Sequence, residues 1–88
     1  DVNVTAIGNI EAIYAKGLAE GAFRDGLDPL GIHWQISALC FFNVSNRATF
    51  SKIFGKDVGS PAYQESLRRQ TVDMVLRFVV RADRLEAL

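Results

Sequence analysis

The sequence predicts an all-α fold, on three observations. Residues 29–46 contain no Asp, Glu, Lys or Arg. Two helix-start signals, Asp28-Pro29 and Ser60-Pro61, divide the chain, because a capping side chain followed by a first-turn proline is typical of a helix start. Apolar residues recur at steps of three and four, and no alternating strand pattern is present. We therefore expect three helices, at about residues 3–21, 29–54 and 61–84.

The first predicted helix has one apolar side, which includes Tyr14, and Glu11 falls within that side. The carboxylate of Glu11 either reaches water or a neighbouring arginine, or it faces a ligand cavity. Gly21 is the natural end of this helix, because glycine adopts the left-handed conformation that stops helices. In the turn that follows, we expect Phe23 to tuck beneath the backbone and Gly26 to adopt a positive φ.

The second predicted helix lacks the charges that a surface helix needs on its solvent side. It is also barely long enough to cross a bilayer and contains histidine, glutamine, serine and asparagine, so we expect no membrane span. At 100° per residue its side chains divide into two faces. One face carries Leu30, Trp34, Ser37, Phe41, Val44 and Ala48. The other face carries Ile32, Gln35, Leu39, Phe42, Asn43, Asn46 and Phe50. Such a helix lies between its own domain and a second contact partner, which is either another segment or another copy of the chain.

The third predicted helix follows a polar loop, residues 55–59, and also has two apolar sectors. One sector carries Tyr63, Leu67, Thr71, Met74, Phe78 and Leu85. The other sector carries Val72, Leu76, Val79 and Val80. Three helices in one copy do not suffice to cover all these sectors, and each large side chain left exposed forfeits about 1.5–3 kcal/mol of burial free energy. We therefore expect a homodimer in solution.

The composition argues against several classes of function. The formal net charge is zero, whereas a nucleic-acid-binding module shows a basic excess or stripe. The single cysteine, Cys40, cannot form an intrachain disulfide, and we expect it to be a small buried hydrophobe in a cytoplasmic protein. The sequence shows no secretion signal, no phosphate-binding glycine loop and no metal-spaced cluster. The single histidine, His33, is expected to be structural, so we expect no enzyme, no metal and no cofactor.

Three motifs accompany the predicted helix boundaries. Residues 21–29 read Gly-Ala-Phe-Arg-Asp-Gly-Leu-Asp-Pro, residues 45–47 read Ser-Asn-Arg, and residues 53–57 read Ile-Phe-Gly-Lys-Asp. Together with the helix start at Ser60-Pro61, their order and spacing resemble the C-terminal half of tetracycline-repressor-like (TetR family) transcriptional regulators. The first motif is similar to the family's frequent Gly-x-Phe-Arg-x-x-x-Asp-Pro start of the eighth helix. The resemblance extends over nearly the whole chain.

The resemblance implies an all-helical ligand-binding and dimerisation domain behind an N-terminal helix-turn-helix. Residues 1–88 would be part of this regulatory domain and would supply its seventh, eighth and ninth helices. The last two helices would form a four-helix bundle with a second copy. DNA would be bound only through the helix-turn-helix, which is missing from this sequence. A small, mostly apolar effector would bind inside each copy.

The resemblance also assigns a role to each face of the second helix. The expected ligand-binding residues are Glu11, Tyr14, Trp34, Ser37 and Phe41. The expected dimer-interface residues are Ile32, Gln35, Leu39, Phe42, Asn43, Asn46, Phe50, Val72, Leu76 and Val79. Two functions stay open. The first is a regulatory domain whose ligand changes the DNA affinity of the helix-turn-helix, and the second is a helical homodimerisation module without an effector.

Overall fold

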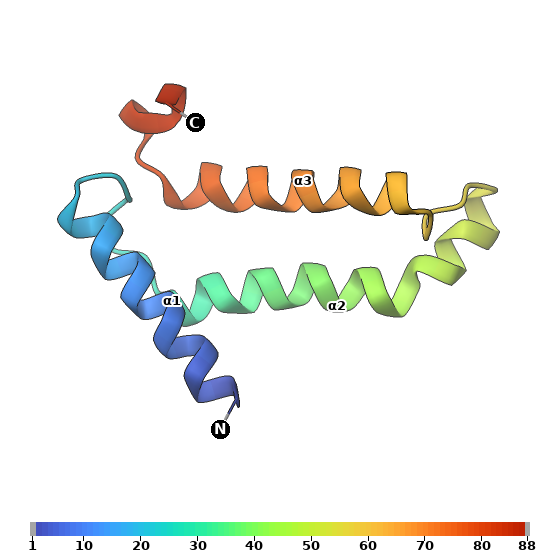
Figure 1. Ribbon diagram of the computed structural model, residues 1–88, viewed down its shortest axis with the longest axis horizontal. Coiled ribbons are helices and arrows are strands. Elements are labelled where there is room, and N and C mark those ends of the chain that lie inside the picture. The colour runs from blue at the N-terminus through green and yellow to red at the C-terminus, as the bar shows by residue number, and fades with distance from the viewer. Residues whose placement is uncertain (1, 88) are drawn as a thin grey trace.

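The computed structural model describes the backbone of residues 2–87 and the side chains of residues 5–86. The elements are α1 (Val2–Ala19), α2 (Pro29–Phe54), α3 (Pro61–Val79) and a short 3₁₀ helix, η1 (Ala82–Ala87). Helices α2 and α3 lie side by side and run in opposite directions (Figure 1). Helix α1 packs against the N-terminal part of α2. The predicted all-α fold is therefore confirmed.

Helix α1 ends at Ala19, slightly before the predicted boundary at residue 21. Gly21 adopts a φ of 71°, and its N–H donates a hydrogen bond to the carbonyl of Leu18 at 3.0 Å. The N–H of Ala22 donates to the carbonyl of Gly17 at 2.9 Å. This is the left-handed closing pattern that glycine permits, and it lies in the turn just beyond the helix.

Helix α2 begins and ends at signals in its own sequence. The carboxylate of Asp28 accepts a hydrogen bond from the N–H of Leu30 at 3.0 Å, and Pro29 follows as the first helical residue. The N–H that proline lacks would have had no partner at this position. At the other end, Gly55 adopts a φ of 62° and donates its N–H to the carbonyl of Ser51. These caps produce a helix over the predicted range.

Helix α3 starts as predicted, with the hydroxyl of Ser60 accepting a hydrogen bond from the N–H of Tyr63 at 3.3 Å. The predicted continuation to residue 84 is wrong, because Val80 is extended, with φ −78° and ψ 140°. Val80 forms an isolated antiparallel bridge with Phe23, in the linker between α1 and α2. At this point backbone groups of Val79 and Arg81 form hydrogen bonds with the linker instead of continuing the α-helical pattern. The helix η1 follows.

The helices form a flat, open arrangement. Its principal extents are 46 × 36 × 18 Å, and its Cα radius of gyration is 15.5 Å. A compact domain of this length has a radius of gyration of about 12 Å. The accessible surface is 6588 Å², whereas a compact monomer of this mass exposes about 5,100 Å². The chain therefore leaves more surface uncovered than a self-contained domain does.

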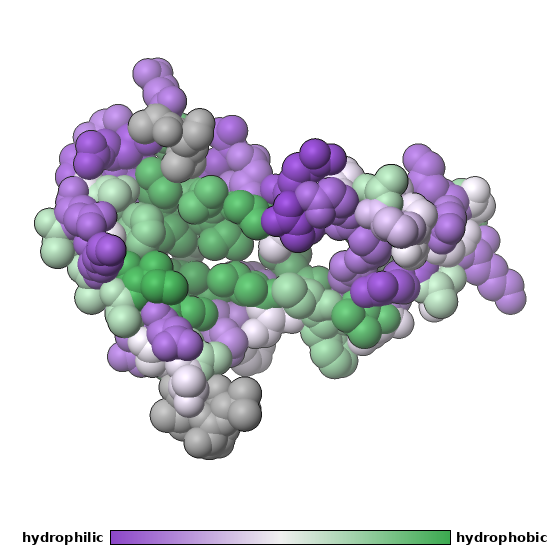
Figure 2. Space-filling model, in the orientation of Figure 1, coloured by the Kyte–Doolittle hydropathy of each residue, from purple (hydrophilic) through white to green (hydrophobic). Residues whose placement is uncertain are grey.

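The buried core lies where α1, the N-terminal part of α2 and the C-terminal end of α3 meet. Tyr14, Ile32 and Val79 form it, and Phe23 packs against it from the linker. Figure 2 shows hydrophobic surface gathered at this end of the molecule, with hydrophilic side chains over the middle of α3. The other end of the α2–α3 hairpin is held instead by contacts among α2, α3 and the loop between them.

Candidate functional site

The side of α2 that points away from α3 is an uncovered aromatic surface. Trp34 is 70% exposed and Phe41 is 74% exposed, and Ser37 lies between them on the same side. Leu30 and Val44 extend this surface along the helix, and both are exposed. We call these five residues the outer face of α2. Three of the predicted ligand-binding residues therefore share one open, uncharged surface.

The structure does not place Tyr14 on that surface. Tyr14 packs beside Ile32 in the core, and Ile32 lies on nearly the opposite side of α2 from Trp34. The hydroxyl of Tyr14 donates a hydrogen bond to the carbonyl of Arg24, so its one donor hydrogen is used inside the chain. Glu11 is exposed on α1. The five predicted ligand-binding residues therefore do not line one cavity here.

A small apolar hollow of about 190 Å³ lies between α1, α2 and α3. Its lining residues are Ile10, Ile13, Tyr14, Phe23, Ile32, Ile36, Val75, Leu76 and Val79. The periodicity of the sequence does not predict this hollow, because its lining residues come from three different helices and the linker. Ile13 is 62% exposed although it lines the hollow, which shows that the hollow opens to the surface.

Along one side of the α2–α3 hairpin neither helix carries a charged residue, although Arg24 lies over the ring of Phe78 at one end and the Lys56 ammonium lies 5.7 Å from the ring centre of Tyr63 at the other. We call this side the charge-free face. From α2 it includes Gln35, Ala38, Leu39, Phe42, Ser45, Asn46, Thr49 and Ile53. From α3 it includes Tyr63, Leu67, Gln70, Thr71, Met74 and Phe78. A hollow of about 350 Å³ that is lined by Gln35, Leu39, Met74 and Phe78 places the two sets on the same side. Large apolar side chains on this face are half exposed, among them Phe42 at 52% and Met74 at 50%.

The residues predicted for a dimer interface do not all lie on one surface of the structure. Ile32 and Val79 are 7% and 6% exposed in the core of the chain, which leaves them little surface for a partner. Leu76 lines the hollow beside α1, and Val72 shares its side of α3. The α3 residues that lie beside Leu39 belong instead to the other apolar sector. Four of the predicted interface residues lie on the charge-free face, namely Gln35, Leu39, Phe42 and Asn46.

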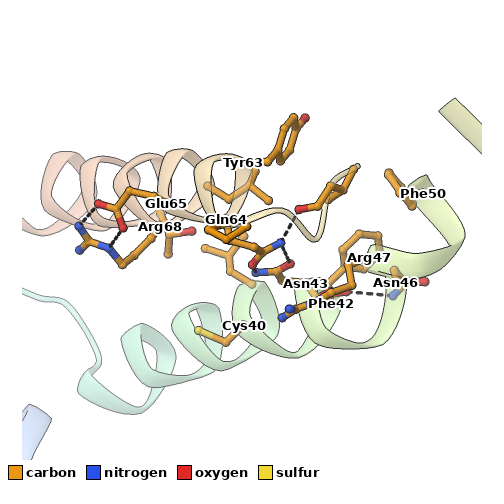
Figure 3. Close-up of a pocket in the computed structure, with 15 residues that line it drawn as sticks. Cys40, Phe42, Asn43, Asn46, Arg47, Phe50, Tyr63, Gln64, Glu65 and Arg68 are labelled. Carbon is orange, nitrogen blue, oxygen red and sulfur yellow. Dashed lines mark hydrogen bonds and ion pairs between the residues drawn. The ribbon is translucent and has the colours of Figure 1, made fainter. Parts of the chain in front are cut away.

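Asn43 has a role inside the chain that its position in the sequence did not reveal. Its side-chain amide is hydrogen-bonded to that of Gln64, across a cleft of about 540 Å³ between α2 and α3 (Figure 3). Cys40 lines the same cleft and is exposed, so the expectation that it is buried is wrong. Phe50 also lines the cleft, and its ring centroid lies 5.5 Å from that of Phe42 and 5.4 Å from that of Phe54.

Two of the charges beside this cleft, those of Glu65 and Arg68, are paired with each other, while Arg47 donates to the backbone carbonyl of Asn43. The Nε atom of Arg68 donates to a carboxylate oxygen of Glu65 at 2.9 Å. This hydrogen bond, helped by the positive charge of Arg68, holds the pKa of Glu65 below its ordinary value, and it raises the pKa of Arg68. The pair is exposed, so it satisfies the charges at the rim of the cleft and adds little to stability.

Comparison with known families decides which fold family this helical arrangement represents. Residues 1–75 match the family described as tetracyclin repressor-like, C-terminal domain. The chain belongs to this family. Neither a search of curated proteins nor a search of solved structures found a match. The match includes α1, α2 and most of α3, so the elements that carry both candidate surfaces are those of a TetR-like C-terminal domain.

Two observations on the described part of this TetR-like domain bear on its chemistry. Within residues 2–87, none of the helices combines the length and apolar character needed to cross a bilayer. Among the described side chains, no three His, Cys, Asp or Glu residues gather as metal ligands would.

Proposed function

We propose that this chain is the effector-binding and dimerisation part of a TetR-family transcriptional regulator. In this proposal, ligand binding changes the DNA affinity of a helix-turn-helix elsewhere in the regulator, and the chain itself catalyses no reaction. The observation that carries the proposal is that α2 is uncovered on two different sides, the outer face and the charge-free face. In this TetR-like C-terminal domain we assign one of the two surfaces to a ligand and the other to a second copy.

The charge-free face is the surface that we assign to the second copy. The accessible surface of one chain, 6588 Å², exceeds that of a compact monomer by roughly 1,500 Å², which is more than the area of about 800 Å² that each partner buries in a stable interface of standard size. Interface cores are depleted in charged residues and rich in aromatic residues and methionine. Phe42, Met74 and Phe78 on this face fit that composition, and two copies would form a four-helix bundle from their α2–α3 hairpins.

The outer face of α2 is the surface that we assign to the effector. Trp34 and Phe41 supply two aromatic walls, and Ser37 supplies one hydroxyl group between them. This combination suits a small, mostly apolar ligand held by one or two directional polar contacts. The outer face carries no charge, so it supplies no counter-charge for a strongly anionic ligand.

A pair of leucine substitutions tests the assignment of the charge-free face. Leu39→Glu places a carboxylate in the proposed contact, where its desolvation costs several kcal/mol. Leu30→Glu makes the same change on the opposite side of α2, where Leu30 is 55% exposed. Sedimentation should show that the parent and Leu30→Glu are dimers at micromolar concentration, whereas Leu39→Glu is a folded monomer. If Leu39→Glu dimerises as tightly as the parent, the assignment is wrong.

The second candidate function is a helical homodimerisation module without an effector. One observation favours it, namely that the donor hydrogen of Tyr14 is used inside the chain and is not available to a ligand. Both functions require the dimer, so they differ only in the role of the outer face. The fluorescence of Trp34 distinguishes the two functions. If it changes when compounds release the regulator from DNA, the first function is supported, and if it does not change, the second is supported.

A further inference from the structure

The linker between α1 and α2 is hydrogen-bonded to the C-terminal end of α3. The N–H of Arg24 donates to the carbonyl of Val79 at 2.8 Å, and the N–H of Arg81 donates to the carbonyl of Ala22 at 2.9 Å. These two bonds flank the bridge between Phe23 and Val80. The α3 helix ends where this pairing begins, so the last residues of α3 are positioned by a linker that lies far earlier in the sequence.

The same linker is also held to α1, in part by the side chain of Tyr14. The hydroxyl of Tyr14 donates to the carbonyl of Arg24 and accepts a hydrogen bond from the N–H of Leu27 at 3.0 Å. The ring of Phe23 stacks on that of Tyr14, with centroids 6.1 Å apart. Phe23 also occupies the space above Gly17, where a Cβ atom would lie 2.0 Å from its ring. The linker is therefore packed and hydrogen-bonded against α1.

The side chain of Arg24 extends this connection to the charge-free face. Its Nη1 atom donates to the carbonyl of Phe78 at 2.8 Å, and its guanidinium carbon lies 5.2 Å from the centre of the Phe78 ring. A planar guanidinium can make the hydrogen bond and the ring contact at once, which an ammonium group does less well. Phe78 is 47% exposed, so Arg24 contacts a residue that still has surface available to a partner.

We infer that Arg24 is a positioning residue that couples α1 to the charge-free face: through it, a displacement of Tyr14 changes the position of Phe78. The path consists of two direct contacts, one from the Tyr14 hydroxyl to the Arg24 carbonyl and one from the Arg24 guanidinium to the Phe78 carbonyl. The inference also explains why Phe and Arg follow one another in the motif at residues 21–29, since Phe23 fixes the linker on α1 while Arg24 fixes it on α3. It rests on the proposed function only in assigning the charge-free face to a second copy.

Amide hydrogen exchange of Tyr14→Phe tests the coupling without reference to dimerisation. This variant keeps the ring and removes the hydroxyl, so the N–H of Leu27 loses its acceptor directly. Coupling predicts that the N–H of Arg81 also exchanges about three- to tenfold faster, as expected when one hydrogen bond that supports it is lost. Ser66→Ala, which removes a hydroxyl group from α3 outside the charge-free face, is the control and should leave Arg81 unchanged. Faster exchange at Leu27 with no change at Arg81 overturns the inference.

Arg24→Lys tests the same path from the opposite direction. Because coupling is reciprocal, this variant should make the N–H of Leu27 exchange about three- to tenfold faster and should weaken the dimer by a similar factor. Arg69→Lys, on the exposed part of α3, is the control. Unchanged exchange at Leu27 overturns the coupling. Faster exchange at Leu27 with unchanged dimerisation supports the coupling and overturns the assignment of the charge-free face to a second copy.

Discussion

The side-chain amides of Asn43 and Gln64 form a reciprocal hydrogen-bonded pair between α2 and α3. Asn43 Nδ2 donates to Gln64 Oε1 at 2.7 Å, and Gln64 Nε2 donates to Asn43 Oδ1 at 3.0 Å. Gln64 Nε2 also donates to the carbonyl of Val58 at 2.8 Å, so the pair holds the loop between the helices as well. Because both amides are partly buried, breaking the pair leaves polar groups without partners.

We predict that Gln64→Leu destabilises the protein by about 1–3 kcal/mol, because the amide of Asn43 and the carbonyl of Val58 lose a partner in a partly buried site. The double variant Asn43→Leu, Gln64→Leu should recover part of this loss, since it removes one orphaned group and adds apolar contact. Urea unfolding of the parent and the variants measures both effects. A double variant that is less stable than the sum of the two single changes contradicts this account.

Asn9→Leu is the matched control for this series. Asn9 is an exposed amide on α1, outside both candidate surfaces. Its replacement should change the free energy of unfolding by less than about 0.5 kcal/mol, as is usual for surface positions. Equal losses at Gln64 and Asn9 would mean that the hydrogen bonds between Gln64 and Asn43 contribute no more than an exposed amide does.

The contact between Gly17 and Phe23 gives a second prediction. Gly17→Ala would place a methyl group 2.0 Å from the Phe23 ring, and overpacking of this kind costs about 1–3 kcal/mol. Gly8→Ala in the same helix meets nothing within 4 Å, and it should stabilise the helix by up to about 1 kcal/mol. Thermal unfolding should therefore shift in opposite directions for the two substitutions. A Gly17→Ala variant as stable as Gly8→Ala would show that Phe23 moves aside freely.

The helix starts could be predicted from the sequence because their causes are local. Asp28 caps the N–H of Leu30, and Ser60 caps that of Tyr63, each within three residues. The end of α3 could not be predicted in this way. Nothing in the residues after Val79 forbids a helix, and the chain leaves the helix because the linker offers hydrogen bonds from a distant part of the sequence.

The candidate surfaces were predictable only in part, for a geometric reason. The 100° rule places Trp34 and Leu39 on different sides of α2, and the structure agrees. The rule does not say how α3 is rotated about its own axis relative to α2. The sequence therefore groups Leu76 with Leu39 as expected interface residues, whereas the structure places Met74 beside Leu39 and Leu76 beside α1. Periodicity orders the side chains of one helix, and packing alone decides how two helices face each other.

The ion pair of Glu65 and Arg68 gives a prediction about pH. The pKa of Glu65 is lowered in the folded protein, mainly by the hydrogen bond from Arg68. The pair therefore contributes stability above the pKa of an unfolded glutamate, and this contribution is lost as the pH falls through the lowered folded pKa. Carboxyl NMR titration should show that Arg68→Gln raises the pKa of Glu65 towards its ordinary value. Arg69→Gln, which removes a weaker influence, should raise it less, and equal effects would contradict the role of the hydrogen bond.

The last prediction concerns the outer face of α2, where Trp34 is the only tryptophan of the sequence. In the intact regulator, compounds that release it from DNA should change the fluorescence of Trp34, because a bound ligand replaces water at an indole that is 70% exposed here. Phe41→Ala removes the second aromatic wall and should weaken the response to these compounds. Phe54→Ala removes a ring of similar exposure, 67%, at the far end of α2 and should leave the response unchanged. If every releasing compound leaves the emission unchanged and Phe41→Ala responds like the parent, the outer face packs against protein, and the homodimerisation module without an effector becomes the better account.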